Sequence, residues 1–373
     1  MPKINAVKII SGRRKNIHSL RLAITTECNL RCVYCFVRKT GKTMRYSTAR
    51  KAVSFFLKSS GKQKLLIIYG GEPLLYFGLL RKIIFYARKT AKQQKKSLVI
   101  SIGTNGTIIN KEQLDFFKKT QVRLAVSIDG EKRFHDASRI FPDKKGSFNQ
   151  LLKNIPIIVS AIKKENLSAL FGVTPPAARF LYKNLLFLNA LGFENINIEP
   201  VQSVNCVWNS SQKRAFQSQL SRYLKYMHKN ILKNAFYFLN TVNRELKDGL
   251  ISRGLKNQLL CPFFWSLEIY PDGEMAFSPF LINEPENTPY LIGNVNHGLA
   301  ARYNECEYRA QKTICQNCWN EYRGARCGAS YAGDVVTVRD IFSIAFARMV
   351  KRKSERSKIF ARYMREAKKR IFE

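Results

Sequence analysis

The chain has 373 residues, with 64 Lys and Arg against 26 Asp and Glu, which gives a formal net charge of +38. Hydrophobic residues make up 45% and aromatic residues 12%, enough for a packed core, so a globally disordered chain is excluded. No apolar run approaches the roughly 18 residues of a membrane span, and charged residues occur throughout the segment from Met1 to Arg21. We therefore expect a cytoplasmic protein without a signal peptide.

Short apolar, β-branched segments alternate with longer amphipathic segments up to Pro200. The expected strands are residues 20–25, 64–69, 98–102, 123–128, 168–173 and 195–199. The expected helices between them are residues 47–59, 74–89, 111–119, 147–164 and 176–190. This alternation indicates βαβ units, and right-handed crossovers would arrange six of them as most of a parallel barrel. The sequence predicts an α/β fold with a partial (β/α)6 TIM-like barrel. In the second helix, Leu75, Leu79 and Ile83 recur at helical spacing, so this face should pack on the sheet.

The pattern changes after Pro200. Residues 210–248 read as one or two long helices, and from Cys261 onward short strands and turns carry five cysteines. Few regular elements and many thiols indicate a small domain stabilised by metal. A tail rich in Lys and Arg follows. We predict a barrel over residues 15–240, a small cysteine-rich domain over 255–340 and a basic helical tail over 341–373.

Three cysteines directly after the first strand are the most informative feature. Cys28, Cys32 and Cys35 are spaced x3 and x2, on a loop at the end of a strand where parallel barrels place their chemistry. Cytoplasmic cysteines seldom form stable disulfides, so these thiols are predicted metal ligands. Thiolates suit iron–sulfur clusters, and three ligands on a four-iron cluster leave one iron open. A structural zinc site with a distant fourth ligand is the alternative.

This loop resembles the cluster loop of the radical S-adenosylmethionine (SAM) enzymes, with Tyr34 before the last cysteine and Phe36 after it. Three further motifs follow the second, third and fourth strands in the family's order: Gly70-Gly71-Glu72-Pro73, Thr104-Asn105-Gly106-Thr107 and Ser127-Ile128-Asp129-Gly130. Each would be weak alone. Their order, each after its own strand, makes the resemblance specific.

The resemblance implies a [4Fe-4S] cluster that binds SAM and cleaves it reductively, with an electron donor such as flavodoxin or ferredoxin. Hydrogen abstraction is then performed by the 5′-deoxyadenosyl radical, so no catalytic side chain is assigned to it. The implied cluster ligands are Cys28, Cys32 and Cys35. The implied SAM contacts are Gly70, Gly71 and Glu72, which bind the amino group in the family, with Asn105, Ser127 and Arg139 as further polar contacts.

The second cysteine set resembles a SPASM domain, which holds auxiliary iron–sulfur clusters in peptide-modifying radical SAM enzymes. Cys261 is followed by the turns Asp272-Gly273 and Gly293-Asn294, then by Cys315-x2-Cys318 and Cys327. Ser278 and Tyr331 stand where the family has cysteines, so one of the two usual clusters should be absent. The implied auxiliary [4Fe-4S] cluster is held by Cys315, Cys318 and Cys327, with Cys261 or Cys306 as the fourth ligand. Zinc in this site is the alternative.

The predicted function is a radical SAM enzyme that abstracts hydrogen from a peptide or protein substrate, in the manner of the sulfatase-maturase-like subgroup. The alternatives are a formylglycine-forming enzyme, a radical enzyme acting on nucleic acid, and a metal-stabilised binding protein without catalysis. The positive field favours an acidic partner, such as nucleic acid, anionic lipid or an acidic peptide; solvated Lys-rich helix faces without a partner are the alternative.

Overall fold

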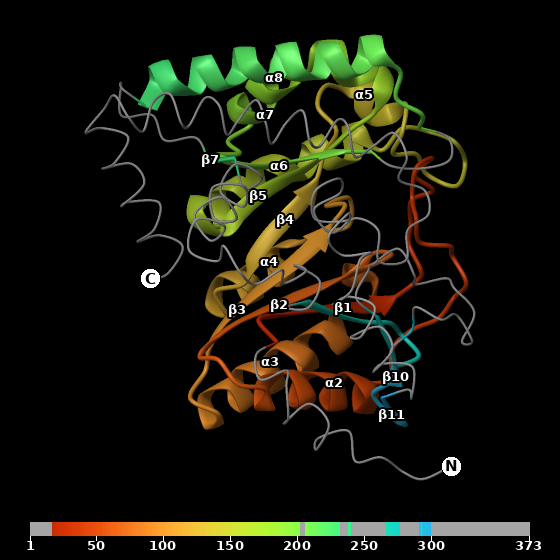
Figure 1. Ribbon diagram of the computed structural model, residues 1–373, viewed down its shortest axis with the longest axis vertical. Helices are drawn as coiled ribbons and strands as arrows, with labels where there is room; N and C mark the ends of the chain where they lie inside the picture. The colour runs from red at the N-terminus through yellow and green to blue at the C-terminus, as the bar shows by residue number, and fades with distance from the viewer. Residues whose placement is uncertain are drawn as a thin grey trace, which may run out of the picture.

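The computed structural model describes residues 17–201, 206–231, 238–239, 266–276, 291 and 293–299 (Figure 1). The expected parallel sheet is present, and its first six strands lie side by side in chain order. Their bounds are β1 Ser19–Thr25, β2 Gln63–Gly70, β3 Ser97–Thr104, β4 Arg123–Ser127, β5 Leu167–Val173 and β6 Asn195–Pro200.

The crossover helices also confirm the predicted alternation. They are α2 Tyr46–Lys58, α3 Phe77–Gln93, α4 Lys111–Lys119, α6 Phe148–Ala161 and α7 Leu181–Ala190, with a short α5 at Lys132–Asp136 that was not expected. Two crossovers begin with a 3-10 turn, η1 Pro73–Tyr76 and η3 Pro175–Phe180, where the sequence predicted a continuous α-helix. Proline fits the first turn of a helix because it has no N–H to donate. A third 3-10 turn, η2, spans Lys164–Asn166.

One face of the sheet is covered by helices, and the other face is the inside of the barrel. Leu20, Leu22 and Ile24 of β1 are fully buried in one apolar cluster with the helices. Because strand side chains alternate, Arg21 and Ala23 point to the inner face.

The predicted packing face of the second crossover helix was wrong at its start. Leu75 is 43% exposed, whereas Leu80, Ile83 and Ala87 of α3 are buried. Leu75 lies in the tighter 3-10 turn η1, so its side chain is out of phase with the α-helix that begins at Phe77.

Strands from the later part of the chain extend the sheet at both sides. β8 (Ser266–Ile269) pairs parallel with β1, and β9 (Glu274–Ala276), β10 (Gly293–Asn294) and β11 (Gly298–Leu299) follow it in antiparallel order. β7 (Phe238–Leu239) pairs with β6. The sheet ends at β11 and β7 within the described residues, so the barrel there is partial, as predicted.

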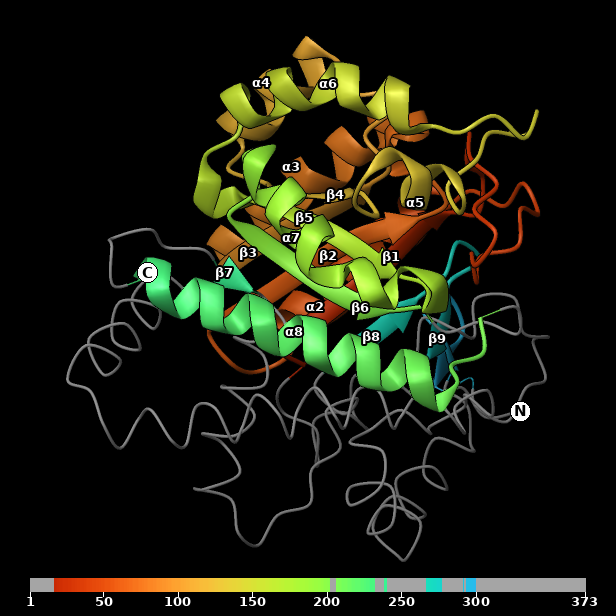
Figure 2. The ribbon, with the colours of Figure 1, turned by 90° about the horizontal axis from the view of Figure 1, so that it is seen from above.

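The long helix α8 (Ser210–Ile231) runs along the outside of α7, as Figure 2 shows. Phe216, Leu220 and Tyr223 of α8 are buried, so this side of the helix packs against the rest of the molecule. The Tyr223 hydroxyl accepts a hydrogen bond from the Asn189 amide of α7 at 2.8 Å.

Several predicted features lie outside the described residues. They are Ser278, Tyr331, the basic tail and the cysteines Cys261, Cys306, Cys315, Cys318 and Cys327. The domain limits therefore stay predictions. In the part of the chain that is described, no helix is long and apolar enough to span a membrane.

Candidate functional site

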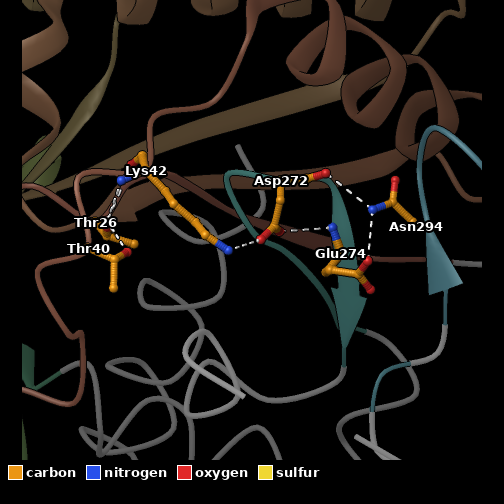
Figure 3. A network of polar contacts seen from close by, with 6 residues as sticks. All are labelled: Thr26, Thr40, Lys42, Asp272, Glu274 and Asn294. Carbon is orange, nitrogen blue, oxygen red and sulfur yellow. Dashed lines mark hydrogen bonds and ion pairs between the residues drawn. The ribbon is translucent and has the colours of Figure 1, made fainter. Parts of the chain in front are cut away.

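The cysteine loop leaves the carboxyl end of β1 and returns to it. Thr25 forms an isolated antiparallel bridge with Thr43, and the Thr26 N–H donates to the Lys42 carbonyl at 2.8 Å. The Lys42 N–H donates back to the Thr26 hydroxyl at 3.0 Å, and this hydroxyl also lies 3.0 Å from that of Thr40 (Figure 3). The loop is thus closed at its base by backbone and threonine hydrogen bonds.

The three loop cysteines are free thiols in one neighbourhood. The Cys35 N–H donates to the Cys32 carbonyl at 3.1 Å, and the Lys39 ammonium lies 3.2 Å from the Cys35 sulfur. Burial raises the pKa of Cys28, and it raises the pKa of Cys32 to about 11. The charge of Cys35 raises both of these pKa values further, so the sulfurs lie within electrostatic range of one another.

The chemistry of these three donors is that of iron–sulfur ligands. No three Cys, His, Asp or Glu side chains of the described residues converge as ligands of one metal ion. In a four-iron cluster each thiolate binds a different iron, so its ligands need not converge on one point. Three soft sulfur donors on one loop match that requirement.

The two glycines after β2 bring the second motif against the start of the cysteine loop. The Gly71 N–H donates to the Thr25 carbonyl at 2.7 Å, and the Glu72 N–H donates to the Glu27 carbonyl at 2.8 Å. A Cβ atom on Gly71 would lie 1.9 Å from the Glu27 oxygen, and one on Gly70, whose φ is +139°, would lie 2.3 Å from the Thr25 oxygen. The sequence indicated glycines that admit a ligand; the structure gives them a second role, the close approach of two backbones.

Glu72 is completely buried at the centre of the motifs. Its Oε1 accepts hydrogen bonds from the Leu74 N–H at 3.1 Å and the Thr104 hydroxyl at 2.8 Å. Its Oε2 accepts one from the Asn105 N–H at 2.7 Å. Burial raises the pKa of Glu72 to about 7, although these three donors favour the ionised form. Oε2 accepts only one hydrogen bond within the protein, so it can accept another from a donor group of a bound molecule.

Asn105 links the third motif to the cysteine loop. Its amide nitrogen donates to Asn29 Oδ1 at 2.8 Å and lies 3.8 Å from the Cys28 sulfur. Its amide oxygen accepts from the N–H and the hydroxyl of Thr107 at 2.9 and 2.7 Å. Asn105 therefore holds the loop in place through contacts within the protein. Neither Asn29 nor Thr107 was singled out from the sequence.

Arg139 and the fourth motif meet at a buried carboxylate. Asp129 is 2% exposed, and its Oδ2 lies 3.0 Å from Arg139 Nε and accepts a hydrogen bond from the Tyr34 hydroxyl. Its Oδ1 accepts from the Gly172 N–H of β5 at 3.0 Å. The Arg139 guanidinium also lies 5.5 Å from the centre of the Tyr34 ring. Burial lowers the pKa of Arg139, but the charge of Asp129 outweighs it and the net shift is upward.

Backbone hydrogen bonds also join the cysteine loop to the segment around Arg139. The N–H groups of Arg31 and Val33 donate to the carbonyls of Ile140 and Ser138 at 2.7 and 2.9 Å. Ser127, at the end of β4, is half-buried, and its side chain has no hydrogen bond within the described residues. The predicted SAM contacts Glu72 and Asn105 thus lie together against the loop, whereas Arg139 reaches the loop through Asp129 and Tyr34.

His135 holds Asp129 and Arg139 in place through hydrogen bonds. Its Nδ1 accepts from the Asp129 N–H at 3.3 Å, and its Nε2 lies 3.0 Å from the Ser147 hydroxyl. The Ser147 hydroxyl in turn donates to the Arg139 carbonyl at 2.7 Å. Burial lowers the pKa of His135 well below its ordinary value, so the ring is neutral and its Nε2–H faces Ser147.

The turns that follow β8 reach the base of the cysteine loop. The Lys42 ammonium lies 2.9 Å from Asp272 Oδ2, and the Asn294 amide donates to the Asp272 carbonyl at 3.2 Å and to Glu274 Oε1 at 2.9 Å (Figure 3). The Asp-Gly and Gly-Asn turns of the sequence are therefore neighbours in space, beside the loop.

Comparison with known proteins agrees with this arrangement. The sequence pattern of the Radical SAM superfamily matches residues 22–176, which run from within β1 past the end of β5 and include all four motifs. Residues 22–176, less than half of the chain, therefore contain a radical SAM domain. This domain and the enzymes similar to it indicate an enzyme, and the alternative of a metal-stabilised binding protein is discarded.

Individual relatives support the same assignment. An uncharacterized protein of Methanocaldococcus jannaschii is 28% identical over 235 residues, 60% of this chain and 78% of that protein. A cysteine-type anaerobic sulfatase-maturating enzyme of Clostridium novyi is 31% identical over 153 residues, 39% of this chain and 41% of that enzyme. The match thus spans less than half of the Clostridium enzyme. The structure of native anSMEcpe with bound AdoMet and Cp18Cys peptide has the same fold, with a TM-score of 0.71, 17% identity and coverage of 91% of this chain and 99% of that chain.

Proposed function

We propose that this radical SAM enzyme modifies a peptide or protein, using a [4Fe-4S] cluster held by Cys28, Cys32 and Cys35. Reductive cleavage of bound SAM would supply the radical that abstracts hydrogen from the substrate. The observation that carries the proposal is the meeting of three motifs, each after a different strand, around the cysteine loop.

The chain's own residues would prepare this site in three ways. Glu72 is buried, with acceptor capacity left on Oε2, so it would accept hydrogen bonds from the amino group of SAM. Asn105, through Asn29, and Asp129, through Tyr34, hold the loop that carries the sulfurs. Glu72 and the following Pro73 and Leu74 of η1 are buried, which keeps water away from the carboxylate.

The substrate class rests on the relatives and on charge. Proteins similar to this chain are described as acting on sulfatases or as bound to a peptide. The net charge of +38 suits an acidic peptide. Formylglycine formation from a Cys or Ser residue is the second candidate, favoured by the resemblance to the Clostridium enzyme. The auxiliary cluster and an external electron donor are parts of the same proposal.

The test uses anaerobically reconstituted enzyme with SAM and a reductant. We expect 5′-deoxyadenosine to form, and replacement of Cys28, Cys32 and Cys35 by Ala to remove about four irons and all of this product. Cys206→Ala is the matched control, because this buried thiol lies outside the loop. Product from the triple variant at the wild-type rate would refute the ligand assignment.

A further inference from the structure

A cation lies beside the sulfur atoms of the cysteine loop. Lys39 follows Cys35 by four residues, and its ammonium nitrogen lies 3.2 Å from the Cys35 sulfur. The next residue is fixed to the end of the first strand, because the Thr40 hydroxyl lies 3.0 Å from the Thr26 hydroxyl. The Thr40 N–H also donates to the Arg38 carbonyl at 3.1 Å, which closes a tight turn around Lys39. These contacts hold the backbone of Lys39 while its side chain reaches the Cys35 sulfur.

Lys39 differs from the other cation of this region, Arg139. Burial raises the pKa of Cys32, the charge of Arg139 lowers it, and the charge of Asp129 raises it again. Asp129 is paired with Arg139 at 3.0 Å, so the two charges largely offset each other at the sulfurs. Lys39 forms no ion pair with a carboxylate in the part of the chain that the structure describes. Its positive charge therefore acts on the sulfurs without such an offset.

The surroundings of the sulfurs otherwise oppose negative charge. Burial raises the pKa of Cys28, and the charges of Glu72 and Cys35 add to this effect. The charge of Lys39 lowers the same pKa, so Lys39 acts on two of the three loop cysteines. Reduction of an iron–sulfur cluster adds one negative charge, and its potential depends on nearby charge and on hydrogen bonds to its sulfurs. A cation this close stabilises the reduced form more than the oxidised form.

We propose that Lys39 raises the reduction potential of the [4Fe-4S] cluster by holding its ammonium group beside the Cys35 thiolate. One electron passes from the external reductant to the cluster, and no bond is formed or broken in this step. The cluster can then be reduced by a donor of less negative potential. Lys39 acts through Cys35, so it is a positioning residue. The inference deepens the proposed function and rests on it.

Three variants separate the charge of Lys39 from its packing. Lys39→Met removes the charge with little change in side-chain length, Lys39→Gln removes the charge but keeps a hydrogen-bond donor, and Lys39→Arg keeps the charge. Lys92→Met is the matched control, because Lys92 is exposed in the last turn of α3. That turn precedes the start of β3, whereas the cysteine loop follows the end of β1, so Lys92 lies at the opposite end of the parallel sheet.

The measurement is a redox titration of the anaerobically reconstituted holoenzyme without SAM or substrate, followed by electron paramagnetic resonance. The signal of this cluster is the one that disappears when Cys28, Cys32 and Cys35 are replaced by Ala, which separates it from any auxiliary cluster. Iron content and SAM affinity are measured for each variant.

We expect the midpoint potential of Lys39→Met to fall by about 59 mV, which is a tenfold change in the ratio of reduced to oxidised cluster for one electron. Lys39→Gln should shift in the same direction, while Lys39→Arg and Lys92→Met stay at the wild-type potential. If Lys39→Met fails to fold, Lys39→Gln decides.

A wild-type midpoint in the neutral variants would overturn the role of Lys39 and leave the ligand assignment intact. A lysine that only stabilises the loop would give that result with less bound iron, and one that contacts SAM would give it with weaker SAM binding. If the wild type shows no signal that the triple alanine variant lacks, the proposed function fails, and this inference fails with it.

Discussion

At the residue scale, Asp129 connects three parts of the chain that are distant in sequence. Its carboxylate binds Tyr34 of the cysteine loop, Arg139 after α5 and the backbone of β5. Burial raises the pKa of Tyr34 well above its ordinary value, so the phenol keeps its proton and donates it. Because Tyr34 stands between Cys32 and Cys35, this bond fixes the segment that carries two sulfurs.

Tyr34→Phe should therefore loosen the cysteine loop. Losing a hydrogen bond to a buried carboxylate should cost about 1–2 kcal/mol of unfolding free energy. We expect the variant to release iron to a chelator faster than the wild type. Tyr86→Phe, which removes a hydroxyl contact with Ser54 between α2 and α3, should release iron at the wild-type rate. Equal release by both variants would refute the anchoring role of Tyr34.

Glu72 predicts a pH dependence of SAM binding. Its pKa is about 7, and only the ionised carboxylate accepts hydrogen bonds on all its lone pairs. If Glu72 binds the SAM amino group, affinity should rise by up to about tenfold per unit as pH increases toward 7, and then level off. Titration calorimetry between pH 5.5 and 8 would measure this. Glu72→Gln should bind more weakly without that rise; an unchanged pH profile in this variant would contradict the assignment.

At the element scale, the contact between the end of β2 and the start of the cysteine loop depends on the absence of side chains. Gly71→Ala would drive a methyl group into the Glu27 carbonyl, so the two backbone hydrogen bonds there cannot both persist. We expect a loss on the order of 3 kcal/mol in unfolding free energy, with loss of bound iron.

Gly78→Ala provides the matched control. Gly78 lies in α3, and a Cβ atom there has no neighbour within 4 Å. Alanine should stabilise the helix by about 0.5–1 kcal/mol. Denaturant unfolding of both variants gives the comparison, and similar midpoints for the two would show that the close approach at Gly71 is not required.

At the scale of the whole molecule, the later part of the chain joins the barrel sheet through β8. The parallel ladder of β8 with β1 carries this connection. The pair of Lys42 and Asp272 is partly exposed to solvent, so it should add little stability by itself. Its position matters more, because it brings the turn after β8 to the base of the cysteine loop.

The auxiliary site gives a prediction for the complete chain. If Ser278 and Tyr331 mark lost ligands, reconstituted enzyme should bind about eight irons in two four-iron clusters. Iron and zinc analysis measures this directly. About twelve irons would refute the interpretation of those two positions, and about four irons with one zinc would favour the structural-zinc alternative.

The sequence by itself determined the parallel strands, their order and the cysteine loop. Those features depend on local alternation and on motifs of a few residues, such as Cys28-x3-Cys32-x2-Cys35. The 3-10 turn at Pro73 escaped prediction because α-helix and 3-10 patterns differ little over four residues. Only the tertiary structure paired Tyr34 with Asp129, Glu72 with Thr104, and Arg21 with Glu268. These partners are 32 to 247 positions apart, and what brings them together is the curvature and strand order of the sheet, which no local pattern encodes.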